Sequence, residues 1–400
     1  MKKQVFDRFL ARIIALGRQV QSPFVGEPDI FRMWMRGGQI FSLSPAGVTE
    51  KSNIIRDLLK HANWSDRFSF DFIRDRVTPL LELVCHGDDA GVPFAFDAAI
   101  RDLEEFDERN TVFLPIVGIE LQDHETWSVG PLTFHRATDA FLQQFCTTPI
   151  EVNYIRRDSN ARVWAESTFV AEPGRAQTLA EELCDPVVDV LRFWMTWSAK
   201  PNSPVGIALE GEFADGSRTR LVRRADGSVI IDHSRTRGLA PLPIGKTLLE
   251  NVQPIYCLMD FAIDPSSQSK FCGLIMHAVQ LYGKGKVSPA GEDRILAYMM
   301  ALEAFLNEKG IAISDSVSEG TVTFLRVAIE ERLRLKKELK RIYGFRSQIS
   351  HGEKIKDLQS ADVQLLERTV IAFITEMIMK RDEFQSKHDL LSYLERKRIE

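Results

Sequence analysis

Apolar residues recur at helical spacing over three stretches of the first 105 residues: 4–19, 51–62 and 70–84. A period of three to four residues gathers the apolar side chains on one face, as in an amphipathic helix. Pro and Gly residues mark three expected loops between these stretches: 23–28, 45–47 and 87–93. Residues 1–105 are therefore predicted to form a mainly helical N-terminal segment.

The pattern changes to period two between residues 106 and 240. Strands are predicted over several short stretches: 111–121, 127–135, 163–170, 206–210, 219–224 and 228–232. One helix is expected over about 175–197, with Pro186 marking a kink or a junction. Asp226-Gly227 is a strong turn signal for a hairpin. We predict an α+β region with mostly antiparallel strands, which could form one domain with residues 1–105.

Beyond a Pro/Gly joint at 239–245 the pattern is almost entirely helical. Helices are predicted at about 246–262, 268–282, 291–309, 319–344, 360–383 and 388–398. Ile295, Met299, Leu302 and Leu306 form one apolar stripe at the spacing that packs helices together. Residues 246–400 are therefore expected to form an all-α bundle.

Composition bounds the class of protein. A length of 400 residues suggests two or three domains, and no apolar run approaches the roughly 18–20 residues of a membrane span. Asp7, Arg8 and Arg12 interrupt any N-terminal apolar leader, so we predict a cytoplasmic protein. The five cysteines have no CxxC spacing, and there is no phosphate-binding glycine loop. No metal or cofactor is expected.

Charge is unevenly distributed along the chain. The net charge is −5, but residues 281–400 hold 21 Lys and Arg against 19 Asp and Glu. Seven cations lie close together in one predicted helical stretch: Arg332, Arg334, Lys336, Lys337, Lys340, Arg341 and Arg346. These cations form either an ordinary solvent-exposed face of the helix or one side of a groove that follows a phosphate backbone. In the second case Arg334, Lys337, Lys340 and Arg341 would bind RNA.

An arginine precedes a histidine by five to seven residues three times: Arg56 and His61, Arg346 and His351, Arg381 and His388. Such spacing is weak evidence, but the second pair has a distinctive setting, with Tyr343 and Ser347 beside the arginine and Gly352 after the histidine. A guanidinium grips phosphate oxygens through a planar fork of donors. An imidazole titrates near neutrality and can move a proton.

The pattern Tyr343-x-x-Arg346-Ser347-x-x-x-His351-Gly352 resembles the ApeA-like branch of the HEPN superfamily, over roughly residues 250–400. Glu303, in an Ala-Leu-Glu context, is a second point of resemblance. Other branches prefer Asn, Asp or His where this chain has Ser347, so the role of Ser347 stays open. The resemblance implies a helical bundle that forms a homodimer, with two motifs facing each other across one cleft.

The resemblance further implies a metal-independent ribonuclease of toxin and anti-phage systems, acting on tRNA or another RNA. His351 would be the general acid or base and Arg346 would stabilise the phosphorane. Glu303 would orient one of them, with Tyr343 and Ser347 in support. The first 240 residues would sense a trigger, such as a phage-encoded protein, and restrain the nuclease.

Three alternatives stay open. The helical domain could be a non-catalytic module that binds RNA or a partner protein. The chain could be an N-terminal enzyme of unknown type with a helical dimerisation domain, although residues 1–240 contain no nucleophile elbow or metal cluster. At the level of single residues, Arg346 could form only a structural ion pair with Glu303 or Glu353, and His351 could only cap helix carbonyls.

Overall fold

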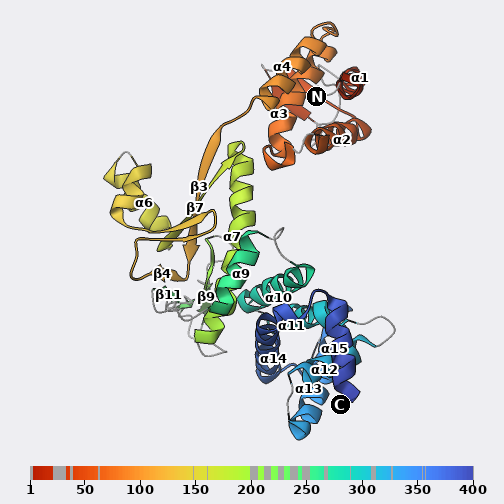
Figure 1. Cartoon of the computed structure of the whole chain (residues 1–400). Helices are drawn as coiled ribbons and strands as arrows, with labels where there is room; N and C mark the ends of the chain where they lie inside the picture. Colours follow the sequence, from red (N-terminus) through yellow and green to blue (C-terminus); the bar gives the residue numbers. More distant parts are fainter. Residues whose placement is uncertain are drawn as a thin grey trace. The chain divides into compact units, whose positions relative to one another are not determined.

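The structure is a computed structural model of the chain. It describes residues 3–20, 33–36, 39–61, 64–146, 148–159, 161–198, 206–210, 218–223, 229–234, 242–245, 253–264, 269–288, 290–307, 312–325, 328–353, 355 and 357–399. Two compact units are present: residues 1–112 with 168–180, and residues 113–167 with 181–400. The strand-rich region and the C-terminal helices therefore lie mostly in the second unit (Figure 1).

The first unit is mainly helical, as predicted for its N-terminal segment. Its elements are α1 (Lys3–Gly17), β1 (Met33–Arg36), β2 (Gln39–Ser42), α2 (Pro45–His61), η2 (Trp64–Asp66), α3 (Phe70–Cys85) and α4 (Val92–Glu104). The antiparallel β1–β2 hairpin was not predicted. The expected loop at 45–47 is wrong, because Pro45 is the first residue of α2, where a missing N–H costs nothing. Likewise, Val92 and Pro93 already belong to α4.

The four helices enclose an aromatic core. Phe9 of α1, Trp64 of η2 and Phe68 are each almost fully buried, and Phe68 stacks on Phe72 with ring centroids 5.2 Å apart. The buried Glu172 carboxylate accepts hydrogen bonds from the backbone N–H groups of Gly174, Arg175 and Ser69. It thereby caps the helix α7 (Pro173–Ser198) and joins it to the start of α3. Burial acts to raise the pKa of Glu172, but the hydrogen bonds outweigh it and lower that pKa.

The middle of the chain forms the strands. They are β3 (Arg109–Val117), β4 (Ile119–Leu121), β5 (Thr126–Val129), β6 (Leu132–Arg136), β7 (Val163–Val170), β8 (Ala208–Leu209), β9 (Arg218–Arg223), β10 (Val229–Ser234) and β11 (Leu242–Ile244). One sheet has the order β5-β6-β7-β3-β8. The β5–β6, β6–β7, β3–β8 and β9–β10 pairs are antiparallel, and β4–β11 is parallel. The prediction of mostly antiparallel strands is confirmed.

Three boundaries in this region differ from the prediction. The strand expected over 111–121 breaks at Gly118, whose φ of +80° is left-handed. The strand expected over 127–135 is a hairpin, because Gly130, with φ +55°, turns the chain between β5 and β6. The expected Asp226-Gly227 turn lies outside the described residues, but β9 and β10 pair on either side of it. Helix α7 extends through Pro186.

Two helical segments accompany the strands. These are α5 (Asp139–Leu142), continued by η3 (Gln143–Phe145), and α6 (Pro149–Asp158). Helix α6 begins with a capping box, in which Thr148 and Glu151 each accept the other's backbone N–H. Neither segment was predicted, although Thr-Pro-x-Glu before apolar residues is a recognisable start signal for a helix.

The C-terminal region is helical, as predicted. Its elements are α9 (Gln253–Ile263), α10 (Lys270–Val287), α11 (Gly291–Leu306), α12 (Ile313–Phe324), α13 (Ile329–Ser350), α14 (Ser360–Met379), η5 (Arg381–Glu383) and α15 (Lys387–Ile399). The single helix expected over 319–344 is wrong, since α12 ends at Phe324 and α13 begins at Ile329. The expected helix at 246–262 begins at Gln253 within the described residues.

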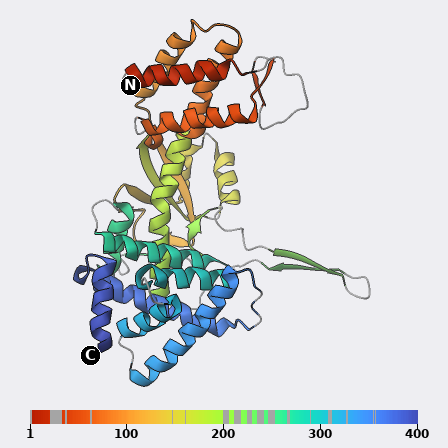
Figure 2. The ribbon, with the colours of Figure 1, turned by 90° about the vertical axis from the view of Figure 1, so that its right-hand side faces the viewer.

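Helix α11 is central to this region and packs against α10, α12, α13 and α14, which appear as the teal and blue helices of Figure 2. Its buried face includes Ile295, Met299, Leu302 and Leu306, which confirms the predicted apolar stripe. A buried ion pair joins α10 to α14, with Lys286 Nζ 2.5 Å from Glu367 Oε1. Among the described residues, no helix is both long and apolar enough to span a membrane.

Candidate functional site

Arg346 is held by a carboxylate from the neighbouring helix. On α13, its Nη2 donates a hydrogen bond to Oε2 of Glu303 on α11, at 3.2 Å, and its Nε lies 3.0 Å from Oε1. The Arg346 side chain is 28% exposed and that of Glu303 13%, so the pair sits at the edge of the helical core. Of the two orienting roles expected for Glu303, this arrangement matches the one toward Arg346.

Tyr343 lies one turn before Arg346 and flanks the ion pair. The Arg346 guanidinium carbon is 5.8 Å from the centroid of the Tyr343 ring, within reach of a cation–π interaction. Burial and then the Glu303 carboxylate raise the pKa of Tyr343, while Arg346 acts to lower it. The phenol therefore keeps its proton and stays a hydrogen-bond donor near this carboxylate.

Ser350 closes the other side of the guanidinium. Its hydroxyl donates to the backbone carbonyl of Arg346 at 2.9 Å, and Arg346 Nη1 lies 3.5 Å from the Ser350 hydroxyl oxygen. Ser347, which the sequence placed next to the arginine, is half-buried on α13. Thus Arg346 has defined neighbours along its own helix as well as from α11.

His351 stands at the end of α13. The helix ends at Ser350, and His351 is the exposed residue that follows. Gly352, with φ +73°, donates its N–H to Ile349 O, and the next residue, Glu353, donates to Gln348 O. These two bonds form a Schellman motif, which the glycine makes possible. The prediction that the helix ends near Gly352 is confirmed, and within the described residues the imidazole forms no hydrogen bond or ion pair.

The end of α13 determines how His351 is presented. Five residues along a continuous helix correspond to about 140° of rotation beyond one turn, so Arg346 and His351 point in different directions from α13. The chain reverses immediately after His351 and leaves its side chain at the surface. One molecule therefore offers an anchored arginine and an exposed histidine at one helix end.

The basic stretch of α13 is largely matched by acidic residues. Its ion pairs are Arg332 and Lys336 with Glu319, Arg334 with Glu331, Lys340 with Asp315, and Arg341 with Glu338 and Asp362. Asp315 and Glu319 belong to α12, and Asp362 to α14. Lys337 is exposed and has no ion pair within the described part of the chain.

These pairs divide the four predicted RNA-binding residues into two groups. Arg334 is 79% exposed and lies 3.9 Å from Glu331 of its own helix, so it and Lys337 face solvent. Lys340 and Arg341 instead fasten α13 to α12 and α14. The hydrogen bonds that Arg341 donates to Asp362 and then to Glu338 raise the pKa of Arg341, and the bond that Asp362 accepts from Arg341 lowers the pKa of Asp362.

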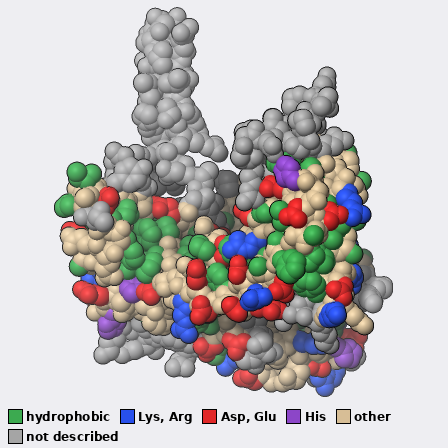
Figure 3. Space-filling model, turned by 90° about the horizontal axis from the view of Figure 1, so that it is seen from above, with side chains coloured by type: hydrophobic (Ala, Val, Ile, Leu, Met, Phe, Trp, Pro, Cys, Tyr) green, Lys and Arg blue, Asp and Glu red, His purple; other side chains and the backbone are tan. Residues whose placement is uncertain are grey.

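The face of the molecule in Figure 3 shows the same mixing on a larger scale, with Lys and Arg side chains lying among Asp and Glu. Within the described residues, no group of three or more His, Cys, Asp or Glu is arranged to hold a metal ion. The described cysteines are all free thiols.

Protein-family models, curated proteins and solved structures were each compared with this chain, and none of the three comparisons found a match. The HEPN resemblance rests on the residues of α11 and α13 described above.

Proposed function

We propose that this chain is a metal-independent endoribonuclease of the HEPN type. The observation that carries the proposal is the ion pair between Arg346 and Glu303 at the edge of the helical core, on the same helix that ends at the exposed His351. The residues that the motif singled out are thus presented in a form that suits phosphate chemistry: an oriented guanidinium and an accessible imidazole.

The reaction is an attack by the ribose 2′-OH on the adjacent phosphorus. His351 takes the 2′-OH proton as general base, the 2′-oxygen bonds to phosphorus, and the bond from phosphorus to the 5′-oxygen breaks. The leaving oxygen takes a proton and becomes a 5′-OH, while the other product keeps a 2′,3′-cyclic phosphate. Arg346 stabilises the negative charge on the pentacoordinate phosphorus. The substrate is RNA because DNA lacks this hydroxyl.

A second copy of the chain completes the proposed site. A single histidine can hold only one of the two proton-transfer roles at a time, and a facing His351 supplies the other. A homodimer with paired motifs, as the resemblance implies, meets this need. Arg334 and Lys337 would contact the RNA backbone beside it.

The biological role proposed is an anti-phage or abortive-infection effector that cleaves tRNA or another RNA in the cytoplasm. Residues 1–240 would act as sensor or regulator and respond to a trigger such as a phage protein. Control of this kind suits a nuclease that harms its own cell.

Purified protein should be incubated with total tRNA in EDTA, and the RNA ends mapped. We expect cleavage that leaves cyclic-phosphate and 5′-OH ends. His351→Ala should reduce the rate by about 10²- to 10⁴-fold, the usual contribution of a general acid or base. His61→Ala is the matched control, since His61 follows Arg56 at the same spacing on α2, and it should retain full activity. An active His351→Ala protein rules the assignment out.

A second candidate is a non-catalytic module that binds RNA or a partner protein. The observation in its favour is that Glu303 already neutralises Arg346, as a purely structural ion pair would. No cleavage by the wild type, together with no His351-dependent toxicity on expression in cells, would favour this candidate. Toxicity lost in His351→Ala would favour the nuclease, even where the isolated protein is inactive without its trigger.

A further inference from the structure

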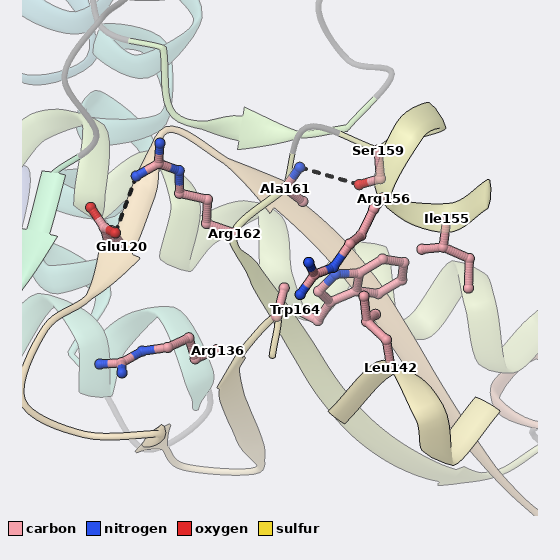
Figure 4. A pocket seen from close by; sticks show the side chains of 10 residues that line it. Glu120, Arg136, Leu142, Ile155, Arg156, Ser159, Ala161, Arg162 and Trp164 are labelled. Atoms are coloured by element: carbon pink, nitrogen blue, oxygen red, sulfur yellow. Dashed lines mark hydrogen bonds and ion pairs between the residues drawn. The ribbon is translucent and has the colours of Figure 1, made fainter. Parts of the chain in front are cut away.

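A pocket of about 370 Å³ lies in the strand-rich part of the second unit, beside β7 and α6 (Figure 4). Its lining residues come from β4, β6, α5, α6 and β7 and from the segments that connect them: Glu120, Arg136, Ala137, Leu142, Ile155, Arg156, Ser159, Ala161, Arg162 and Trp164. Small-molecule sites occupy about 300–1,000 Å³, so this pocket suits a ligand at the small end of that range.

One side of the pocket is aromatic and apolar. Trp164 of β7 is half-buried and packs, with Ile155, against a small core that includes the buried Leu142. Figure 4 shows Trp164, Leu142 and Ile155 together on this side of the pocket. The indole is therefore fixed from behind while part of its surface still borders the cavity. Such a surface can stack on a planar ring.

The rest of the lining is basic. It contains three arginines, Arg136, Arg156 and Arg162, against one carboxylate, Glu120. Arg162 Nη1 lies 3.1 Å from Glu120, and Arg156 Nη2 lies 2.5 Å from Asp139 just outside the lining. In each ion pair the closest contact involves one terminal nitrogen of the guanidinium, so the other N–H donors of that arginine remain for further oxygens.

Arg136 is fixed more firmly. Its Nη2 donates to the carbonyls of Leu121 and Gln122, at 2.5 and 2.7 Å, which holds the loop after β4 in place. Its Nε is buried and has no hydrogen-bond partner within the described residues. Because this atom is closed off from solvent, Arg136 forms a fixed part of the pocket wall, and its Nε is not one of the donors that would contact a ligand.

We propose that this pocket binds a mononucleotide. Arg156 and Arg162 would hold its phosphate through paired N–H donors, and Trp164 would stack on its base. A free phosphate would satisfy the arginines but leave the indole and its apolar neighbours without a role. The cavity volume holds one nucleotide rather than a strand. This site is separate from the proposed nuclease residues and does not depend on them.

The test is isothermal titration calorimetry of the full chain with five kinds of probe: the four ribonucleoside monophosphates, ATP, adenosine, inorganic phosphate and a short single-stranded RNA. We expect at least one mononucleotide to bind with one-to-one stoichiometry, and at least tenfold more tightly than adenosine or phosphate. An Arg156→Gln and Arg162→Gln double variant should weaken that binding at least tenfold.

Further variants separate the roles of charge and stacking. Trp164→Leu should weaken nucleotide binding at least fivefold and leave phosphate binding unchanged, because only the base meets the indole. Trp164→Phe keeps an aromatic face and should stay within about threefold of the wild type. Arg368→Gln controls for the loss of an arginine outside the pocket, since Arg368 is exposed on α14, and it should bind as the wild type does. Circular dichroism confirms that each variant is folded.

Three results would overturn the proposal. The first is that no mononucleotide gives saturable binding to the folded wild type. The second is equal binding by the arginine double variant. The third is binding of phosphate alone, or of RNA alone, with no effect of Trp164→Leu, which would leave an adventitious anion site or an RNA surface instead.

Discussion

Helix α13 and the pocket beside β7 both concentrate positive charge, but they assemble it differently. The α13 cations lie close together in the sequence, between Arg332 and Arg346, and carboxylates of α11, α12 and α14 pair with most of them. The pocket arginines are spread over residues 136–162, and the sheet and α6 bring them to one cavity. A cluster of basic residues in the sequence reflects local composition only. The positive charge that a ligand can reach depends on which acidic side chains the fold places beside those residues.

The largest expected effect separates two arginines of α13. Arg346→Ala should reduce RNA cleavage by at least about 100-fold, since a donor aimed at developing charge contributes that much, while stability changes by no more than about 1 kcal/mol. Arg341→Ala, five residues earlier, should leave cleavage intact while stability falls by about 1 kcal/mol, because the Asp362 carboxylate loses a partner. Cleavage assays and urea unfolding check both. Equal loss of cleavage in the two variants contradicts the division.

The second effect is a pH dependence of stability. The hydrogen bond from Arg341 lowers the pKa of Asp362 in the folded state below its ordinary 3.8. The ionised carboxylate therefore stabilises the fold above that value, and the contribution is lost as pH falls through the folded-state pKa. Asp362→Asn should cost about 1–2 kcal/mol at pH 7 and clearly less at pH 3. Urea unfolding at both pH values tests this, and a pH-independent cost would contradict it.

Gly344 inside α13 and Gly352 just beyond its end should respond to substitution in opposite directions. Gly352 has φ +73°, so Gly352→Ala should destabilise by about 1 kcal/mol through backbone strain alone, since open space surrounds its Cβ position. Gly344 lies inside the helix, also with open space around the Cβ position. Gly344→Ala should stabilise by about 0.5–1 kcal/mol through helix propensity. Thermal unfolding of the two variants measures the change in stability that each substitution causes. A change in the same direction for both variants would be inconsistent with a helix that ends before Gly352.

The smallest effect concerns RNA affinity. Lys337→Ala and Arg334→Ala should each weaken binding a few-fold and reduce the salt dependence by about 0.7 in the log–log slope, as expected for one lost phosphate contact. Lys340→Ala should leave the slope unchanged, because Asp315 already holds that ammonium. Each substitution is made in the His351→Ala protein, so that the RNA is not cleaved during the assay, and its RNA affinity is measured by filter binding at several salt concentrations. A full slope change for Lys340→Ala would show that its ion pair opens on binding.

Periodicity predicted the helices whose buried faces are apolar, such as α3 and α14, but it failed on α12. That helix has the sequence Ile-Ser-Asp-Ser-Val-Ser-Glu-Gly-Thr-Val-Thr-Phe, which is rich in residues that disfavour helix interiors. Its polar groups are satisfied inside the fold: Ser316 donates to Leu306 O, and Thr321 to Val317 O at 2.7 Å. Tertiary packing, which no local window contains, makes this segment helical.

The sequence proposed the residues of the candidate site, and it also offered an ion pair between Arg346 and Glu303, which the structure contains. The contacts of the neighbouring cations could not be proposed in the same way. The acidic partners of Lys340 and Arg341 on other helices, Asp315 of α12 and Asp362 of α14, are 21 to 25 residues away, so the sequence could not identify them. The pocket escaped prediction for a related reason, since Arg136 and Trp164 meet only after the chain has returned through β7.

Gly118 has a consequence for the order in which the chain can fold. A Cβ there would lie 2.2 Å from the carbonyl oxygen of Gly206, and the Gly118 carbonyl accepts the N–H of Leu242 at 2.9 Å. Three segments separated by up to 124 residues thus meet at one glycine. Contacts between residues so far apart in the sequence form slowly. Strand β4 lacks its partner β11 until residue 244 has been synthesised. A fragment ended near residue 240 would expose that edge to pairing with other chains.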